Sequence, residues 1–137
     1  MHLRIARPSK ALPISERFWT DGVGLSVLWR TPPECTDENP LLMVGVPGAA
    51  WHIELVGDLT NVGAAAAPAV SVPVPTPTDE DLLVIYIGEP IDRGLIRRIR
   101  AAGGVRVKAA NPYWDQWGVT FRDPDGYHFV LSDRRWE

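Results

Sequence analysis

The pattern of apolar and polar positions divides the chain into two halves that repeat the same order of elements. Each half begins with a short strand, continues with a helix whose apolar residues recur every three to four positions, and ends with three more strands. The predicted strands cover residues 3–7, 25–31, 41–46 and 50–56, then 82–87, 105–109, 117–122 and 127–132, and the predicted helices cover 9–20 and 90–102. Two β-α-β-β-β units in tandem predict an α+β fold.

Glycine and proline mark the ends of these elements. Gly22 is the predicted cap of the first helix and Gly103 that of the second. Residues 111–116 are a predicted loop, and the Asp-Pro-Asp-Gly sequence at 123–126 is a predicted tight turn. Between the halves, Ala, Val and Pro dominate and the prolines disfavour a helix. We therefore expect one domain over 1–137, with module one at about 1–60, a linker at about 61–80 and module two at about 81–137.

The closing strands of the two halves carry a similar sequence. The first reads Trp51-His52-Ile53-Glu54-Leu55 and the second Tyr127-His128-Phe129-Val130-Leu131. Because side chains alternate along a strand, the aromatic or apolar first, third and fifth positions share one face, which we expect to pack on the helices. The histidines and the variable fourth position, glutamate in one copy and valine in the other, share the opposite face.

Composition narrows the function classes. The chain has 137 residues, of which 45% are hydrophobic and 23% charged, which is ordinary for a globular domain. A net charge of −3 argues against nucleic-acid binding, and the arginines at 97, 98 and 100 are interpreted as a solvated helix face. No apolar stretch of the sequence is long enough to span a bilayer. The single cysteine, Cys35, excludes an internal disulfide and favours a cytoplasmic location; without basic neighbours it is interpreted as inert.

The whole chain resembles the vicinal oxygen chelate superfamily, which includes glyoxalase I, bleomycin resistance proteins, fosfomycin resistance enzymes and extradiol dioxygenases. The segments that carry the resemblance are 18–25 (FWTDGVGL), 51–55 (WHIEL) and 121–127 (FRDPDGY). The resemblance implies that the two modules pair their sheets into a U-shaped cleft. It also implies that metal-using members hold one divalent ion there, with ligands on the first and last strand of each module.

Carried over onto this chain, those four ligand positions fall on Arg4, Glu54, Leu82 and Val130. Glu54 alone among them can bind a metal ion, since a guanidinium is always protonated and the aliphatic side chains have no donor atom. His2 lies on the same strand face as Arg4, at the chain terminus. No metal cofactor is therefore expected, with zinc, nickel, manganese or iron as the alternative.

If a metal does bind, the candidate ligands are Glu54, His52 and His128, which would form a two-histidine, one-carboxylate set if the histidines face each other across the cleft. The preferred interpretation is that both histidines line the cleft wall or lie at the surface.

Without a metal, the cleft would be a mixed apolar and polar pocket of the kind that binds small molecules. Arg4 and Glu54 are expected to form a structural ion pair, or alternatively to recognise a carboxylate. Trp19, Trp29 and Trp51 are expected in the core, whereas Trp114 and Trp117 either stack on a flat ligand or are buried. The candidate ligand-binding residues are Arg4, His52, Glu54, Tyr86, Trp114, Trp117 and His128; no catalytic residue is assigned.

The sequence thus favours a cytoplasmic small-molecule-binding protein of the glyoxalase/bleomycin resistance type, with a degenerate metal site and a role in resistance or sequestration. The resemblance adds the expectation of a homodimer. One alternative is a metal-dependent lyase, transferase or dioxygenase of the same superfamily. The second is an interaction module without a ligand.

Overall fold

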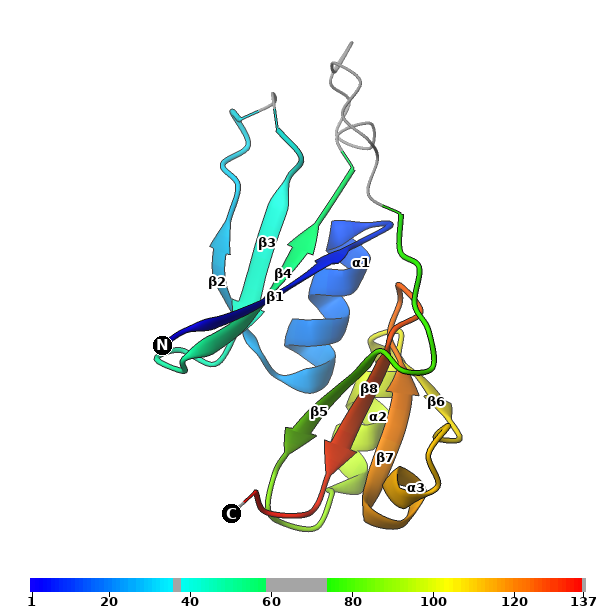
Figure 1. The fold of residues 1–137 in the computed structure, drawn as a ribbon. Coiled ribbons are helices and arrows are strands. Elements are labelled where there is room, and N and C mark those ends of the chain that lie inside the picture. Colours follow the sequence, from blue (N-terminus) through cyan, green and yellow to red (C-terminus); the bar gives the residue numbers. More distant parts are fainter. Residues whose placement is uncertain (36–37, 59–73, 137) are drawn as a thin grey trace.

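A computed structural model describes residues 1–35, 38–58 and 74–136 of the chain (Figure 1). Most of the predicted linker at 61–80 lies outside these residues. Module one comprises β1 (Leu3–Pro8), α1 (Leu12–Arg17), η1 (Phe18–Val23), β2 (Ser26–Arg30), β3 (Leu41–Gly45) and β4 (Trp51–Val56). Module two comprises β5 (Leu82–Tyr86), α2 (Arg93–Ala101), β6 (Val105–Val107), α3 (Tyr113–Trp117), β7 (Gly118–Arg122) and β8 (His128–Ser132). The α+β fold of two βαβββ modules is confirmed.

The two modules form sheets with the same connectivity. Sheet 1 has the strand order β1-β4-β3-β2 and sheet 2 the order β5-β8-β7-β6. In each sheet the first strand is parallel to the last: the helix carries the chain to the opposite edge, and the antiparallel strands that follow bring it back beside the first strand. The other pairs are antiparallel. The register places Arg4 beside His52 and Leu82 beside His128, so the repeated histidines occupy matching places.

The first helix ends differently from the prediction. α1 has Pro13 in its first turn, where a missing N–H is tolerated, and continues as the π-helical segment η1. The left-handed cap is Gly24, with φ of 95°, and the prediction of Gly22 as the cap was wrong. Gly22 lies inside η1 against α2, where an added Cβ would sit 3.0 Å from that of Ala102 and 3.3 Å from the Cα of Ile99. Its lack of a side chain lets the two helices touch.

Short-range hydrogen bonds define the start of the second helix and the conformation of residues 111–116. Asp92 caps α2 by accepting from the Leu95 N–H at 3.1 Å, and Gly103, with φ of 104°, follows its end as predicted. The predicted loop contains the short helix α3. There Asn111 accepts from the Tyr113 N–H, and Asp115 accepts from the Ala109 N–H, each at 3.0 Å.

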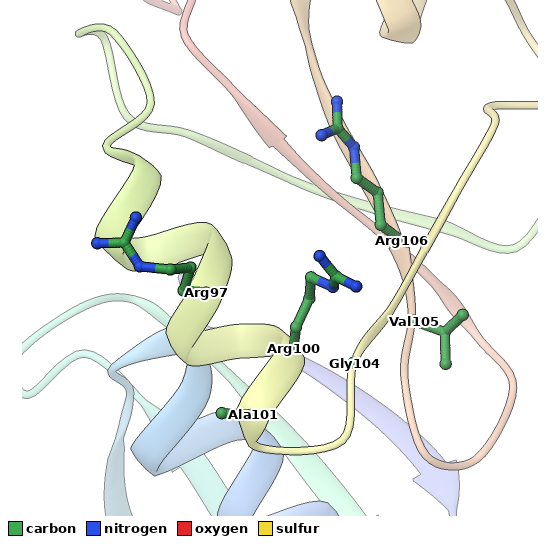
Figure 2. A pocket seen from close by; sticks show the side chains of 6 residues that line it. All are labelled: Arg97, Arg100, Ala101, Gly104, Val105 and Arg106. Atoms are coloured by element: carbon green, nitrogen blue, oxygen red, sulfur yellow. The ribbon is translucent and has the colours of Figure 1, made fainter.

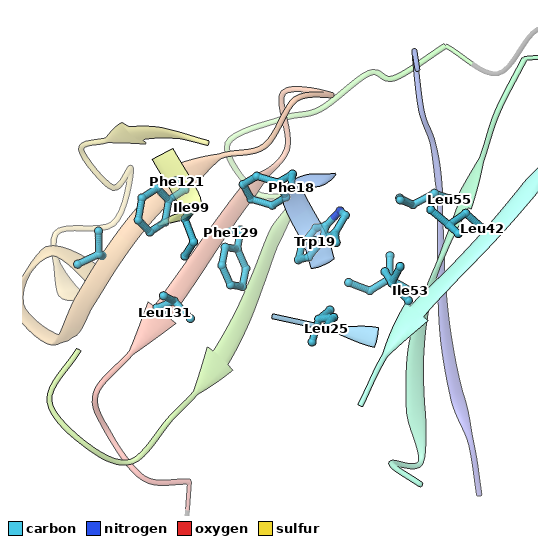
Figure 3. Packing of buried hydrophobic residues seen from close by; sticks show 12 residues of the cluster. Phe18, Trp19, Leu25, Leu42, Ile53, Leu55, Ile99, Phe121, Phe129 and Leu131 are labelled. Carbon is cyan, nitrogen blue, oxygen red and sulfur yellow. The ribbon is translucent and has the colours of Figure 1, made fainter. Parts of the chain in front are cut away.

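One hydrophobic core joins the modules, with η1 between the two sheets (Figure 3). The Trp19 and Phe129 rings meet edge to face with centroids 5.3 Å apart. The predicted helix-facing residues Ile53 and Leu55 of sheet 1 and Phe129 and Leu131 of sheet 2 are all buried in this core. The other face of each sheet, here called its outer face, points away from the core. In a single chain the outer faces therefore point away from each other.

The turn at 123–126 fastens module two to module one. Asp125 is buried, and its carboxylate accepts from the Lys10 N–H at 2.7 Å and from the Ser15 hydroxyl at 2.6 Å. The Arg7 guanidinium lies 4.4 Å from the centroid of the Tyr127 ring. Because these contacts cross between modules, they fix the orientation of one half against the other.

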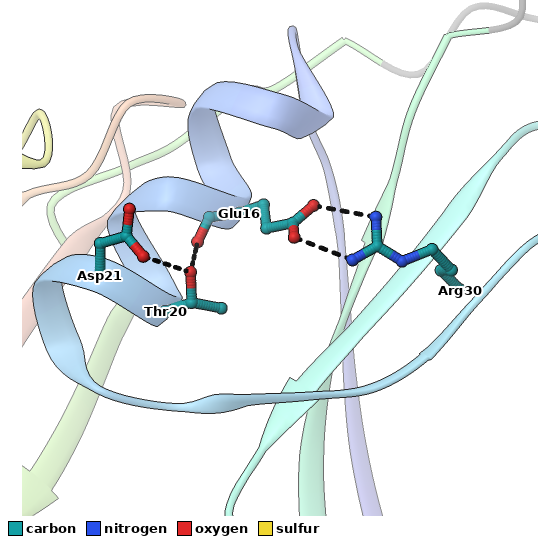
Figure 4. A network of polar contacts seen from close by, with 4 residues as sticks. All are labelled: Glu16, Thr20, Asp21 and Arg30. Carbon is teal, nitrogen blue, oxygen red and sulfur yellow. Dashed lines mark hydrogen bonds and ion pairs between the residues drawn. The ribbon is translucent and has the colours of Figure 1, made fainter.

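A polar network on module one ties its helix to the edge strand β2 (Figure 4). Arg30 makes a bidentate pair with Glu16 at 2.8 and 3.3 Å, and the Thr20 hydroxyl lies 2.9 Å from the Glu16 carbonyl oxygen. The Arg30 side chain is half exposed, so the pair adds little stability.

On the same strand Trp29 is 45% exposed, and its predicted core position was wrong because β2 lies at the sheet edge. No described helix is long and apolar enough to cross a membrane.

Candidate functional site

The residues predicted to line the cleft all lie on outer faces, as the strand alternation required. Sheet 1 contributes Arg4, His52 and Glu54, which adjoin in the β1–β4 register. Sheet 2 contributes Tyr86 and His128, and the β5–β8 register places Leu82, Val84 and Val130 on the same outer face. Since the outer faces point in different directions, the structure of one chain brings each set together but keeps the two sets apart.

The outer face of sheet 1 carries a network of side chains that bond one another. Arg4 Nη1 lies 2.8 Å from Glu54 Oε2, and Arg4 Nε donates to His52 Nε2 at 3.0 Å. The other ring nitrogen of His52, Nδ1, lies 2.7 Å from His2 Nε2. Glu54 Oε2 accepts no hydrogen bond of good geometry, so its contact with Arg4 is an ion pair. The predicted Arg4–Glu54 pair is therefore present, with His2 as an additional member of the network.

These contacts determine the proton positions on the two histidines. Because Arg4 Nε–H is a donor, His52 Nε2 must accept and carries no proton. Neutral His52 then has its proton on Nδ1, which donates to His2 Nε2. Burial lowers the pKa of His52, and electrostatic interactions with Arg4 and His2 lower it further, while Glu54 opposes them. The network is thus arranged around a neutral His52.

The donor set of one chain does not fit a divalent metal ion. No three His, Cys, Asp or Glu side chains of the described residues lie close enough together to hold one. The carboxylate of Glu54 already faces the Arg4 guanidinium, and the corresponding positions on sheet 2, Leu82 and Val130, have no donor atoms. The alternative ligand set also fails within one chain, because His52 and His128 lie on the outer faces of different sheets.

The outer face of sheet 2 ends in an aromatic cluster, defined here as Tyr86, Tyr113, Trp114 and Trp136. The Tyr86 ring lies 6.2 Å from that of Trp114 and 5.6 Å from that of Trp136, and Tyr113 meets Trp114 edge to face at 5.0 Å. A hollow of about 530 Å³ opens here, and its lining residues are Tyr86, Tyr113, Arg134, Arg135 and Trp136. The place combines flat rings with two cationic side chains.

The other two predicted residues of this module lie at some distance from that hollow. Trp117 packs beneath the Arg134 guanidinium, which is 4.9 Å from its ring centroid and also donates to the Tyr113 hydroxyl at 3.1 Å. His128 opens β8, whereas the neighbour of Tyr86 is Ser132 at the far end, roughly 13 Å along the strand. The structure thus brings Tyr86 and Trp114 together, links Trp117 to them through Arg134, and leaves His128 apart.

Sequence reasoning missed several of the residues that complete these two surfaces. His2 was weighed but set aside as terminal, although it bonds to His52. Tyr113, Arg134, Arg135 and Trp136 were not considered as candidates. The available signal was the Arg-Arg-Trp sequence directly after the last strand, since a chain leaving β8 must pass the end of the neighbouring strand β5.

Comparisons with known proteins agree with this architecture. Residues 80–133 match the family model described as the YycE-like C-terminal domain. The whole chain is 32% identical over 136 residues to the uncharacterized protein YycE of Bacillus subtilis (strain 168), covering 97% of this chain and 88% of that protein.

Solved structures extend the comparison. A crystal structure of B. subtilis YycE, a protein of unknown function, has a TM-score of 0.76 at 28% identity and covers 99% of this chain and 91% of its own. The fosfomycin resistance protein FosX from Listeria monocytogenes, complexed with Mn(II) and a dihydroxypropylphosphonic acid, has a TM-score of 0.64 at 14% identity, covering 96% and 90%. TnmS3, an antibiotic binding protein from Streptomyces sp. CB03234, has a TM-score of 0.56 at 18% identity, covering 96% and 93%. The last two similarities concern the fold.

Proposed function

This chain belongs to the YycE-like family, within the vicinal oxygen chelate superfamily, and from that premise we propose that it binds a small, planar organic molecule without a resident metal. Sequestration of such a molecule, including in resistance, is the role that this activity would serve. TnmS3 has the same fold and is an antibiotic binding protein, so the proposal attributes to this chain a use to which the fold is put elsewhere. The cytoplasmic location and the absence of nucleic-acid binding stay predictions from composition.

The observation that carries the proposal is the aromatic cluster at the end of sheet 2. Its hollow of about 530 Å³ falls within the usual size of small-molecule sites, roughly 300–1,000 Å³. The Trp136 ring is 80% exposed, so a ligand that stacks on it would bury apolar surface that now faces water. Arg134 is already engaged by Trp117 and Tyr113, and it would hold the rings in place. Flat faces at a fixed spacing favour a planar ligand.

We further propose that the complete site contains two copies of the chain. The outer faces of one chain point apart, but β1 and β5 are edge strands whose outer sides are free to meet the corresponding edges of a second copy. In that arrangement the polar network of one copy would lie opposite the apolar outer face of sheet 2 in the other. The Arg4 side chain, 52% exposed, would then offer its remaining N–H donors to a polar group of the ligand.

The proposal is tested by titrating the protein with a panel of planar aromatic compounds and following tryptophan fluorescence. We expect at least one compound to bind, and we expect Trp136→Ala and Trp114→Ala to weaken its affinity at least tenfold. Trp29→Ala is the matched control, because Trp29 is also exposed but lies on the edge strand β2 of the other module. No binding across the panel, or equal loss in the control, would refute the stacking site.

A separate measurement addresses the metal-dependent alternative. Elemental analysis of the purified protein should find no stoichiometric zinc, nickel, manganese or iron, because Arg4 neutralises the carboxylate that a metal would need. Stoichiometric metal that disappears in Glu54→Ala would replace the proposal with a metal enzyme. Sedimentation equilibrium completes the test, since a monomer at micromolar concentration would contradict the two-copy site while leaving the stacking site to be judged by the titration.

A further inference from the structure

A strongly basic stretch lies on the helical side of module two. Residues 93–108 contain six arginine or lysine residues and no acidic residue, in a chain whose net charge is −3. The stretch runs from α2 through the turn at Gly104 into the edge strand β6. Positive charges placed close together on one short segment repel one another, which is unfavourable unless a bound anion or another contact compensates them.

Three of these arginines line a hollow of about 510 Å³ between α2 and β6. They are Arg97 and Arg100, one helical turn apart on α2, and Arg106 on β6. Figure 2 shows Arg100 and Arg106 on either side of Gly104, while the Arg97 guanidinium points along the helix and away from the other two. Gly104 lets the turn between α2 and β6 lie directly on the core, since an added Cβ would be 2.7 Å from Ile99 Cγ2 and 2.9 Å from the Phe18 ring.

Within the described residues these three arginines have no acidic partner. The ion pairs there are Arg4–Glu54 and Arg30–Glu16. Arg98, on the same helix, differs because its Nε donates to the Gly22 carbonyl at 3.0 Å and holds α2 against η1. The hollow is therefore lined by three exposed arginines without a described acidic partner, whereas Arg98 has a structural task.

We propose that this hollow binds a small anion with two or more phosphate groups. A single carboxylate or phosphate matches one guanidinium fork, so a hollow lined by more than one arginine suits several adjacent oxyanions. The lining offers no aromatic ring on which a base could stack, so recognition rests on the guanidinium groups and the phosphates. A volume of about 510 Å³ accommodates such an anion but not a folded polymer.

The site is independent of the proposed small-molecule site. Arg106 is paired in register with Phe121, a core residue, so its side chain lies on the helix side of sheet 2 and not on the outer face. The strand β6 is also the sheet edge opposite β5, whose edge would meet a second copy. Both sites could be occupied together, and failure of either leaves the other unaffected.

Isothermal titration of the full chain with inorganic tripolyphosphate at low and at moderate salt tests the proposal. We expect one site per chain, an affinity that falls as salt rises, and at least tenfold weaker binding in Arg100→Gln and in Arg106→Gln. Arg93→Gln is the matched control, because Arg93 is an exposed arginine of α2 that does not line the hollow. It should bind like the unmodified protein. Orthophosphate, with one phosphate group, should bind at least tenfold more weakly than tripolyphosphate.

Three results would overturn the proposal: no binding of tripolyphosphate at low salt, equal weakening by Arg93→Gln, or tighter binding of a single-stranded oligonucleotide than of tripolyphosphate. Circular dichroism of each variant checks that it is folded. The substituted arginines are exposed and make no described side-chain bond, so folding should be unchanged.

Discussion

The outer faces of the two sheets occupy matching positions but differ in chemistry. On sheet 1 the β1–β4 pair carries Arg4, His52 and Glu54. Arg4 contacts both His52 and Glu54, and the His52 ring contacts the ring of His2. On sheet 2 the β5–β8 pair carries Leu82, Val84 and Val130, which have no polar atoms, and the face ends in the aromatic cluster. On one face charged and polar side chains contact one another, whereas the other face offers apolar and aromatic surface.

The inner faces, by contrast, remain alike. Ile53 and Leu55 on β4 match Phe129 and Leu131 on β8, and all four are buried in one core. A residue of the inner face must fit the helices and the other module, so its chemistry is constrained by packing. The described residues of the outer faces do not belong to the shared core, and there the chemistry of the two sheets differs. The comparison teaches that repetition of the fold does not imply repetition of the site.

The largest effect on stability is expected for substitutions on the inner faces, where the two sheets are alike. Ile53→Ala and Phe129→Ala should each lower the free energy of unfolding by about 2–5 kcal/mol, because each leaves a cavity in the shared core. Since the core joins the modules through Trp19, both variants should still unfold in one transition, with tryptophan fluorescence and circular dichroism changing together in urea.

Leu28→Ala provides the matched control for this experiment. Leu28 is a large aliphatic residue of sheet 1, but it is exposed on β2, so its loss should change stability by no more than about 0.5 kcal/mol. Two separate unfolding transitions, one sensitive to Ile53 and the other to Phe129, would show that the modules are independent and would contradict the single core.

The sequence predicted the inner faces well because their signal is local and periodic. Alternation along strands and three- to four-residue spacing along helices depend on nearest neighbours, and the duplicated strand Trp51–Leu55 fixed the register of its counterpart. The errors arose where contacts between modules decide. Gly22 has the residue type of a helix cap, yet its place is set by the approach of α2. Trp29 has the hydrophobicity of a core residue, yet its strand is an edge.

The candidate site was predicted only within each sheet. Alternation correctly grouped Arg4 with His52 and Glu54, since these residues share one face of adjacent strands. Alternation could not show whether the outer face of sheet 2, which carries His128, lies opposite the outer face of sheet 1. That depends on how the two modules pack through their helices. Nor could it place Trp136 beside Tyr86, a contact made by a segment without periodicity.

A second, smaller effect sharpens the comparison at the turns before the last strands. Module two has Asp123 and Asp125 there, whereas the corresponding segment of module one, residues 46–50, has no carboxylate. Burial raises the pKa of Asp123 from 3.8 to about 6, and the charge of Asp125 raises it too, while the N–H groups of Tyr127 and Asp125 and the charge of Arg7 oppose this. A raised pKa means that the folded protein binds this proton more tightly than the unfolded chain. The resulting stability is complete below pH 3.8 and is lost as the pH rises through about 6.

Asp123→Asn should remove this pH dependence, because both N–H donors bond to Oδ1, which asparagine retains. The free energy of unfolding of the variant, relative to the unmodified protein, should therefore rise by up to about 3 kcal/mol between pH 4 and pH 7. Taking the difference cancels groups common to both proteins, among them His52, whose lowered pKa acts with the opposite sign. Asp115→Asn is the control: Asp115 also accepts a backbone N–H but is exposed. A difference that stays flat with pH would contradict the buried carboxyl.

The smallest effect tests whether the outer face of sheet 1 is a closed network. Arg4→Met removes the guanidinium and leaves Glu54, which is 8% exposed, without its ion pair. We expect a loss of roughly 1 kcal/mol, at the low end for an unsatisfied buried group because the Arg4 side chain is half exposed. Glu54→Gln in the same chain should recover most of this loss, since an amide needs no counter-charge. Full cost in the double variant would mean that Arg4 acts through packing alone.

The same variant should change the proton affinity of His52. Arg4 donates to Nε2 of His52. Burial is the largest cause of the lowered His52 pKa, and the charge of Arg4 is the next. Without it Nε2 is free to take up a proton, so in Arg4→Met the pKa should move upward toward 6.5, though burial keeps it from reaching that value. Long-range ¹H–¹⁵N spectra resolve the three histidines, so the protonation of His52 can be followed separately. If instead His52 kept its pKa, the contact with Arg4 would not hold the proton on Nδ1, and the network on this face would be open rather than closed.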